Sequence, residues 1–228
     1  PEDGYHGDDI IEHAKAYIQE FGDTLVNKTS EERQKALVDY ALPINIKRIS
    51  EILSTYGISY DVWFSEKSLH ESGAVNKAIK LLGEKGYTIE KQGAIWLNAE
   101  MLGIEKDEVL VRNNGVPTYM AADIAYHYNK FIERGFDWVI NLWGADHHGH
   151  VARMKASMVP FGINPDKLHV VLFQLVRLYR NGEIARMSKR TGKAISLGDL
   201  LEEVGKDAAR FIFNLKTSGS HLDFDLDL

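Results

Sequence analysis

Residues 138–150 read WVINLWGADHHGH: a short apolar run, then a glycine, then polar residues. An uninterrupted apolar run of this length is typical of a strand that is buried in a parallel sheet. A helical pattern follows as far as Met158, a second strand is predicted at residues 168–178, and Asn181-Gly182 then turns the chain back. Because strand and helix alternate here, the sequence predicts an α/β fold that contains one half of a doubly wound sheet.

Three helical stretches open the chain. Asp8 or Asp9 can cap the first of them. Thr29 and Glu32 form a candidate capping box for the second, and the third follows Pro43 with the same apolar period. Most of the first quarter of the chain is therefore expected to be helical.

A mixed α+β pattern comes next. Residues 58–64 alternate between apolar and polar side chains, which predicts a strand. A helix through residues 75–82 is expected to end at Gly86, where glycine can adopt a left-handed conformation. Residues 87–97 and 109–119 have the pattern of hairpins, the second with an Asn-Gly turn.

Two further helices are predicted in the second half of the chain. One spans residues 123–134 and ends at Gly135. The other begins where Ser196 and Asp199 can form a cap, and it ends at Gly205.

The composition excludes several classes of protein. Cysteine is absent, so neither a disulfide framework nor a thiolate metal site is possible. No run of 18 apolar residues predicts a transmembrane helix, and no signal-peptide pattern opens the chain, which together favour a cytoplasmic protein without a membrane partner. The net charge of −6 argues against a strongly basic nucleic-acid module. Local patches decide such binding, however, and basic residues gather between Arg177 and Lys193.

The first candidate site follows the strand at residues 138–143. In open α/β sheets, ligands bind beyond the carboxyl ends of the strands. Gly144 allows a ligand to approach the backbone, and the Asp146 carboxylate can accept hydrogen bonds from ribose hydroxyls. A plain helix cap is an equally good interpretation of Asp146 from its position alone.

His147, His148 and His150 suggest a metal site, since three imidazoles and one aspartate lie within five residues. His147 and His148 point in different directions at a helix start, and no second cluster of ligands is evident. The sequence therefore predicts no metal ligand.

Two further segments carry side chains suited to chemistry. In the loop Arg186-Met187-Ser188-Lys189-Arg190, the lysine has a flexible side chain that can neutralise charge during phosphoryl transfer. Taken alone, such a pentapeptide is more often an exposed basic loop without a catalytic role. Tyr119 and Asp123 lie four residues apart and can face one pocket if their helix starts early. A carboxylate beside a phenol is a good receptor for a guanidinium group, whereas Asp123 could also serve only the helix dipole.

Taken together, these segments resemble the arginyl-tRNA synthetases, a family of class I aminoacyl-tRNA synthetases. RMSKR at 186–190 is similar to the KMSKS signature, and GADHHGH at 144–150 to the Gly-x-Asp segment before the second-half helix. GVPTYMAADIAYH at 115–127 resembles the arginine-binding helix of the family, and residues 196–211 and 222–228 resemble its stretch after the signature loop. The resemblance covers essentially the whole chain.

The resemblance implies a fold and a division of the chain. The fold would be the second half of a Rossmann-like nucleotide-binding domain with an inserted α+β connective segment. Four segments follow: a helical part of the insertion at 1–57, the α+β connective insertion at 58–118, the second Rossmann half with the signature loop at 119–193, and a helical stem-contact segment at 194–228.

The resemblance also implies roles for residues in the signature loop. Lys189 would stabilise the pyrophosphate as it leaves, and Ser188 and Met187 would shape the loop around ATP. Arg186 and Arg190 replace the first lysine and the final serine of the family's signature, which are mild changes.

Further roles are implied around the strand ends. Gly144 and Asp146 would contact the adenosine ribose, and the backbone of Val176 would lie near the adenine. His147 would face the amino-acid substrate. Tyr119 and Asp123 would together bind the guanidinium group of arginine.

The implied reaction is that of an arginine–tRNA ligase. ATP, with Mg²⁺, would activate arginine to arginyl-adenylate, and tRNA(Arg) would then accept the arginyl group and be needed for the first step as well. Positioning and charge stabilisation carry such a reaction, because no covalent enzyme intermediate is required.

One departure from the family pattern is large. The HIGH signature of the first nucleotide-binding half is not in these 228 residues. That N-terminal half and a C-terminal anticodon-binding domain are therefore expected partners, and the chain by itself is predicted to be inactive. Robust ATP–pyrophosphate exchange by the chain alone, with arginine and tRNA, would refute this prediction.

Three other functions remain open from the sequence. Another class I synthetase of related architecture, such as a cysteinyl enzyme, is the first alternative, although cysteine recognition there uses zinc held by thiolates and this chain has no cysteine. A noncatalytic module that binds nucleotide or tRNA is a second alternative. A metal hydrolase built on the three histidines is the third.

Overall fold

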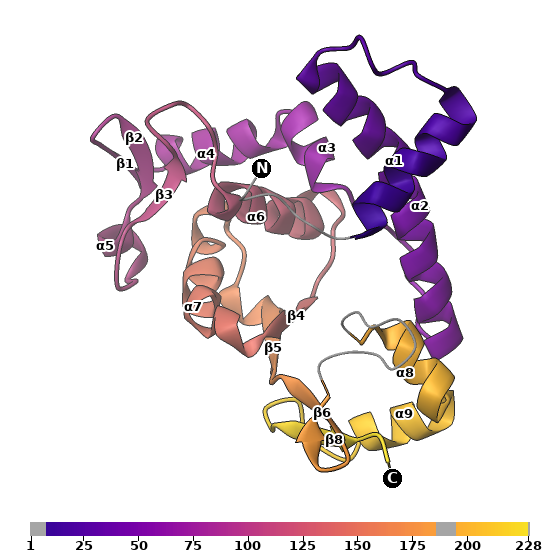
Figure 1. Cartoon of the computed structure of the whole chain (residues 1–228). Helices are drawn as coiled ribbons and strands as arrows, with labels where there is room; N and C mark the ends of the chain where they lie inside the picture. Colours follow the sequence, from indigo (N-terminus) through magenta and orange to yellow (C-terminus); the bar gives the residue numbers. More distant parts are fainter. Residues whose placement is uncertain (1–7, 186–194, 228) are drawn as a thin grey trace. The chain divides into compact units, whose positions relative to one another are not determined.

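The chain folds as two compact units. The computed structural model describes residues 8–185 and 195–227 (Figure 1). One unit is formed by residues 1–61 and 188–210, and the other by residues 62–187 and 211–228. The division into four segments by role, expected from the sequence, stays a prediction. No helix in the described residues is long and apolar enough to cross a membrane.

The first unit is helical, as predicted. Helix α1 (Asp8–Phe21) packs against α2 (Ser30–Tyr56), and α8 (Leu197–Val204) also contacts α2. The capping box predicted for α2 is confirmed, since the Thr29 hydroxyl accepts from the Glu32 amide at 3.2 Å and the Glu32 carboxylate accepts from the Thr29 amide at 2.9 Å. The capping box of Ser196 and Asp199 at the start of α8 is confirmed as well.

The second and third predicted helices are one continuous helix, because α2 runs through Pro43. Proline removes one backbone hydrogen bond and normally kinks or breaks a helix. Contacts with α1 on both sides of Pro43 hold α2 together. Tyr40 packs edge-on against Tyr17 with ring centroids 5.3 Å apart, and Asn45 shares a 2.9 Å hydrogen bond with His13.

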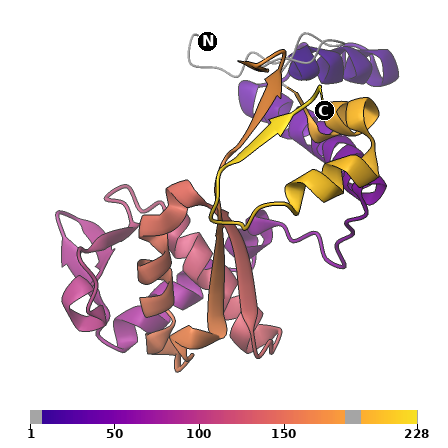
Figure 2. The ribbon, with the colours of Figure 1, turned by 90° about the horizontal axis from the view of Figure 1, so that it is seen from below.

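The second unit contains the predicted parallel strands. Strand β4 (Val139–Gly144) pairs in parallel with β5 (Leu168–Phe173), so that Gly144 lies opposite Phe173 (Figure 2). Helix α6 (Tyr119–Tyr128), its π-helical continuation η1 (Asn129–Glu133) and helix α7 (His148–Ala156) contribute to the same buried apolar cluster as these strands. The helix predicted at 123–134 therefore begins one turn earlier.

Strand β4 is less buried than its apolar sequence predicts. Val139 and Asn141 face the core, whereas Ile140 and Leu142 on the other face are 64% and 67% exposed. The prediction of a strand buried on both faces is thus wrong for this chain, because helices of the described residues cover one face of the two-stranded sheet.

The strand predicted at 168–178 is two strands in different sheets. β5 ends at Phe173, and β6 (Val176–Arg180) joins β7 (Glu183–Ile184) and β8 (Leu222–Asp225) in the order β7-β6-β8. Between them the Gln174 amide donates to the Ser218 carbonyl at 3.0 Å instead of continuing the ladder. The predicted Asn181-Gly182 turn is confirmed, with φ of 51° and 75°.

Helix α9 (Lys206–Phe213) precedes β8. Its Arg210 guanidinium donates to the Tyr56 carbonyl at 3.2 Å and lies over the Tyr56 ring. A cation at this place stabilises the C-terminal end of α2, where backbone carbonyls lack helical partners.

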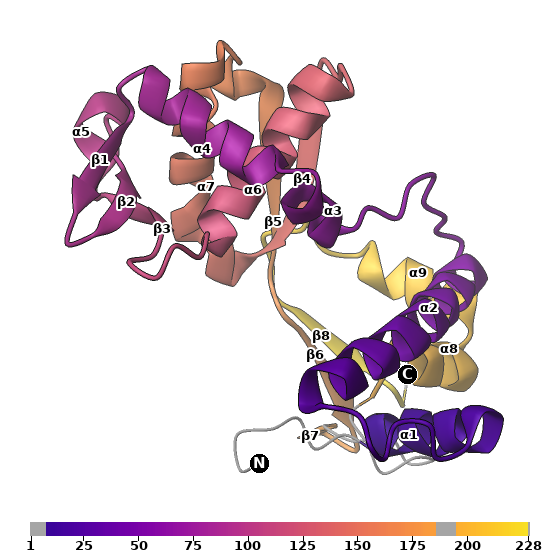
Figure 3. The same cartoon turned by 90° about the horizontal axis from the view of Figure 1, so that it is seen from above.

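The α+β segment has three antiparallel strands with the order β1-β2-β3. The elements are α3 (Glu66–Glu71), α4 (Ala74–Glu84), β1 (Thr88–Lys91), β2 (Ala94–Leu97), α5 (Ala99–Leu102) and β3 (Glu108–Val111). Helix α4 contacts α6 (Figure 3), and the end of α4 near Gly86, with φ of 78°, is confirmed. The first hairpin, β1 with β2, is also confirmed.

One prediction in this segment is wrong. Residues 58–64 form no strand; Phe64 instead stacks on Tyr126 of α6 with ring centroids 4.4 Å apart. A strand pattern does not say which partner is available.

The second hairpin forms as a short one. Val111 pairs antiparallel with Pro117, and the Thr118 amide donates to the Leu110 carbonyl at 2.9 Å. The predicted Asn-Gly turn is confirmed, with φ of 79° at Gly115, and the returning arm is short because α6 begins at Tyr119.

Candidate functional site

The site lies beyond the carboxyl ends of the two parallel strands, where α/β sheets bind ligands. Gly144 ends β4, and the 3₁₀ turn η2 (Ala145–His147) leads from it into α7. A Cβ atom at residue 144 would lie 2.4 Å from the Asp146 Oδ1 atom. The glycine therefore makes room for the side chain of Asp146 rather than for an unusual backbone angle, since its φ is −66°.

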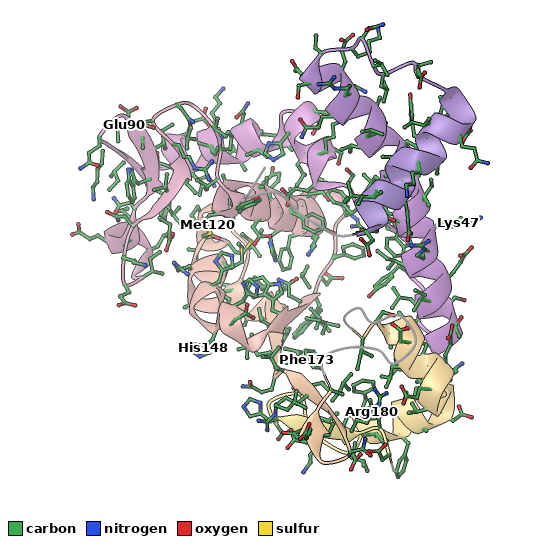
Figure 4. All side chains as sticks on the ribbon, viewed as in Figure 1. Lys47, Glu90, Met120, His148, Phe173 and Arg180 are labelled. Carbon is green, nitrogen blue, oxygen red and sulfur yellow. The ribbon has the colours of Figure 1, made fainter. Side chains whose placement is uncertain are left out.

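A cavity of about 450 Å³ opens at this place. It brings together four of the residues predicted for ligand binding, two from α6 and two from the turn after β4. Its lining consists of Tyr119, Met120, Asp123, Trp143, Asp146, His147, Gly149, His150 and Arg153. Figure 4 labels Met120 at the start of α6 and His148 at the start of α7, the two helices that form its walls.

The early start of α6 places Tyr119 and Asp123 on one side of the cavity. Thr118 caps the helix: its hydroxyl accepts from the Ala121 amide at 3.4 Å and donates to the Val109 carbonyl of β3 at 2.6 Å. Residues four apart on a helix share a face. The condition attached to the sequence prediction, an early helix start, is therefore met.

Asp123 is a half-buried carboxylate with one side occupied. Its Oδ2 atom lies 3.1 Å from Nε2 of His150, in the first turn of α7. Burial alone would raise the pKa of Asp123, but the hydrogen bond from His150 and the nearby charge of Lys130 outweigh it, so the pKa lies below its usual value. The group is therefore an anion at neutral pH.

A buried polar chain lies behind Asp123, and the sequence did not predict it. His127 is 1% exposed, and its Nδ1 donates to the Asp123 carbonyl at 2.8 Å, because a carbonyl can only accept. Nε2 of His127 then accepts from the Asn141 amide at 2.7 Å, and the Asn141 oxygen accepts from the Lys130 ammonium at 3.3 Å. Each polar group in this chain has a partner.

Burial shifts the pKa values of the two titratable side chains in this hydrogen-bonded series, His127 and Lys130. It lowers the pKa of His127, and the neighbouring Lys130 charge adds to the effect, so the ring is neutral. Burial likewise lowers the pKa of Lys130, while Asp123 opposes the change. The Lys130 ammonium also lies 4.0 Å from the centroid of the Tyr126 ring, a favourable cation–π contact. The sequence contains one sign of this buried hydrogen-bonded series: Asn141 is the single polar residue within the apolar run at residues 138–143.

Arg153 is a second residue that sequence reasoning missed. Its guanidinium forms an ion pair with Glu108 of β3 and donates from Nε to the Gly149 carbonyl at 3.0 Å. Both partners are largely buried, so the cation is held at the cavity wall rather than free to swing.

The three histidines point to different partners. His150 bonds Asp123, His147 lies 3.7 Å from the Asp146 carboxylate, and no three histidine, aspartate or glutamate side chains of the described residues are grouped as metal ligands would be. His147 and His150 line the cavity, whereas His148 does not.

Other predicted site residues are elsewhere. Met187, Ser188 and Lys189 lie outside the described residues. Val176 begins β6, three residues beyond the end of β5, and pairs with Leu222 of β8; it does not line the cavity.

Comparison with known protein families identifies the family of this chain. A family model described as tRNA synthetases class I (R), catalytic domain, matches residues 8–219. The chain belongs to this family. Its fold is that of a class I synthetase catalytic domain, which confirms the fold predicted from the sequence.

Individual members of the family are similar over the whole chain. The arginine–tRNA ligases of Ruminiclostridium cellulolyticum and Acetivibrio thermocellus are each 70% identical to it over 228 residues. The chain spans about 40% of the length of these two relatives.

Two solved structures of arginyl-tRNA synthetases are similar to this chain in fold. A putative arginyl-tRNA synthetase from Campylobacter jejuni is 38% identical, with a TM-score of 0.88, and the match covers all of this chain and 49% of that one. The arginyl-tRNA synthetase of Thermus thermophilus, 20% identical with a TM-score of 0.68, matches 99% of this chain and 49% of its own, and shares the fold.

Proposed function

We propose that this chain supplies the arginine receptor and a nucleotide contact of an arginine–tRNA ligase. The observation that carries the proposal is the single cavity that holds Tyr119, Asp123, Asp146 and His147 at the carboxyl ends of parallel strands. The names of the 70% identical relatives support the same activity. The substrates would be arginine, ATP and tRNA(Arg), in a cytoplasmic enzyme.

Arginine would bind with its guanidinium group at Asp123. The carboxylate is ionised and half-buried, which strengthens a hydrogen bond to a cation relative to one in water. The Tyr119 hydroxyl can accept from the same planar group, and the Tyr119 ring, 83% exposed, stands where an incoming ligand can cover it. His147, across the cavity, would face the rest of the amino acid.

ATP would bind beside the amino acid, at the turn after β4. Gly144 and Asp146 would contact the adenosine ribose, with Asp146 accepting from its hydroxyls, and the backbone of Val176 would lie near the adenine. Met187, Ser188 and Lys189 would close around the phosphates, with Lys189 as the cation that stabilises departing pyrophosphate.

The reaction would proceed in two displacements. The arginine carboxylate attacks the α-phosphorus of ATP, and the bond to the β-phosphate oxygen breaks to release pyrophosphate. A terminal ribose hydroxyl of the tRNA then attacks the arginyl carbonyl, and AMP leaves. The residues of this chain orient the reactants and stabilise charge, so a large part of the rate enhancement would come from positioning.

Magnesium would enter with the nucleotide. Mg²⁺ keeps several water ligands and binds chiefly through phosphate oxygens with one or two carboxylates. In residues 8–185 and 195–227 no cluster of three histidine or carboxylate side chains is arranged to hold a metal. The ion would therefore compensate phosphate charge on the ATP rather than occupy a cage of side chains.

An exchange assay with the complete gene product tests the function. We expect incorporation of labelled pyrophosphate into ATP that requires both arginine and tRNA(Arg), and none with lysine in place of arginine. Equal exchange with lysine would contradict the assignment of arginine, and no exchange with any amino acid would favour a noncatalytic nucleotide- or tRNA-binding module.

Gly144→Ala is a sharper test of the nucleotide contact. The new methyl group would meet the Asp146 carboxylate, which is exposed and can rotate away, so we expect a normal fold but a KM for ATP that rises about tenfold. The KM for arginine should change less than twofold. Gly219→Ala is the matched control, because a Cβ there meets no atom within 4 Å. An unchanged KM for ATP would remove Asp146 from the nucleotide site.

A further inference from the structure

The two oxygens of the Asp123 carboxylate have different surroundings. Oδ2 is bonded to Nε2 of His150 at 3.1 Å, whereas Oδ1 takes part in no hydrogen bond with any residue in the described part of the chain. A carboxylate has about four acceptor positions, so Oδ1 is available to a ligand in the cavity that Asp123 lines. The asymmetry depends on where His150 is held.

His150 is fixed from two sides. It lies in the first turn of α7, and its ring centroid is 5.3 Å from that of Trp143 at the end of β4. The His150 side chain is only 21% exposed. Trp143 packs against the buried apolar cluster, so the imidazole is supported by the sheet as well as by its own helix.

The main chain of Asp123 is fixed independently. His127 donates to its carbonyl from within α6, and Asn141 of β4 holds His127 in turn. The backbone is therefore anchored by one histidine and the carboxylate by another. Rotation about the two side-chain bonds of Asp123 is then the freedom that His150 restricts.

We infer that His150 is a positioning residue for the substrate cation: by binding Oδ2 it turns Oδ1 of Asp123 toward the cavity. This inference rests on the proposed function and deepens it. Because His150 takes one acceptor position of Oδ2, Oδ1 is the more accessible oxygen for a guanidinium. The guanidinium donates one N–H to Oδ1 and another to the Tyr119 hydroxyl on the same side of the cavity.

The geometry gives selectivity as well as affinity. A planar guanidinium has N–H groups that diverge in fixed directions, which matches two acceptors on separate side chains. A carboxylate free to rotate would accept an ammonium group equally well. Loss of His150 is therefore expected to weaken arginine binding and to leave ATP binding unaffected.

The test uses the complete gene product and three variants. His150→Phe keeps a ring against Trp143 but removes the hydrogen-bond donor, His150→Gln keeps a donor near the position of Nε2, and His70→Leu changes an exposed histidine of α3 as a control. The KM values for arginine and for ATP are measured in pyrophosphate exchange. We expect His150→Phe to raise the KM for arginine roughly tenfold or more, the usual effect of losing a hydrogen bond to a charged group.

The KM for ATP should stay within twofold in every variant, and His150→Gln should recover arginine binding to within about threefold of the unmodified enzyme. A merely structural role would move both KM values together, and that outcome overturns the inference. So does a KM for arginine that is unchanged in His150→Phe, or equal in the Phe and Gln variants. If His150→Phe does not fold, His150→Leu takes its place with the same criteria.

Failure of this inference can be distinguished from failure of the proposed function. An unmodified enzyme without arginine-dependent exchange would contradict the function itself. An unmodified enzyme with normal exchange, combined with an unaffected His150→Phe variant, would contradict only the role of His150.

Discussion

Asp123→Asn in the complete gene product is expected to weaken arginine binding about a hundredfold. The substitution keeps the size of the side chain and removes its negative charge. A hydrogen bond between ionised partners is worth about twice one between neutral groups, and the half-buried cavity wall strengthens it further. ATP affinity should change less than threefold, since Asp123 is assigned no contact with the nucleotide.

The dissociation constants of arginine and ATP, measured by calorimetry, check this result. Asp166→Asn is the matched control: it makes the same chemical change at an exposed carboxylate before β5 and should leave both constants unaltered. Arginine affinity within threefold of the unmodified protein would show that another group receives the guanidinium. Equal loss of arginine and ATP affinity would indicate a general disturbance of the cavity.

The parts of this site that could be predicted from the sequence are those defined by local geometry. Gly144 and Asp146 follow a strand directly, and Tyr119 and Asp123 are separated by one helical turn, so spacing alone places each pair. The partners of Asp123 were not predictable in this way. His150 reaches Asp123 across 27 residues of chain, and no local rule states how far α7 is rotated about its axis.

The same distinction applies to the fold. Helix caps at Thr29 and Ser196 and the turn at Asn181 were predicted correctly, since each depends on residues within four positions of one another. The strand predicted at 58–64 is absent, because the segment has no strand partner. The strand predicted at 168–178 is confirmed as strand but divided in two, because the chain changes sheets at Gln174. Strand formation is decided by pairing, which sequence periodicity does not contain.

His127→Leu tests the buried chain behind Asp123. Leucine is close in size but leaves the Asn141 amide, which is buried, without its acceptor. A buried polar group that loses its partner costs about 1–3 kcal/mol, and disruption of the adjoining bonds adds to this, so the free energy of unfolding should fall by about 2–4 kcal/mol. His70→Leu, at an exposed position, is expected to change it by about 0.5 kcal/mol or less.

The pH dependence of stability identifies His127 more specifically. Its pKa is lowered in the folded protein, whereas in the unfolded chain it is near 6.5, so below that pH the unfolded chain binds a proton that the folded protein refuses. The stability contribution of the neutral ring is complete above about pH 6.5 and declines as the pH falls toward the folded pKa, by at most about 1.4 kcal/mol per pH unit. Protection of the β4 amides in hydrogen exchange, at pH 7.5 and 5.5, should therefore fall further in the unmodified protein than in His127→Leu. Equal slopes in the two proteins would mean that the fold does not lower the pKa of His127.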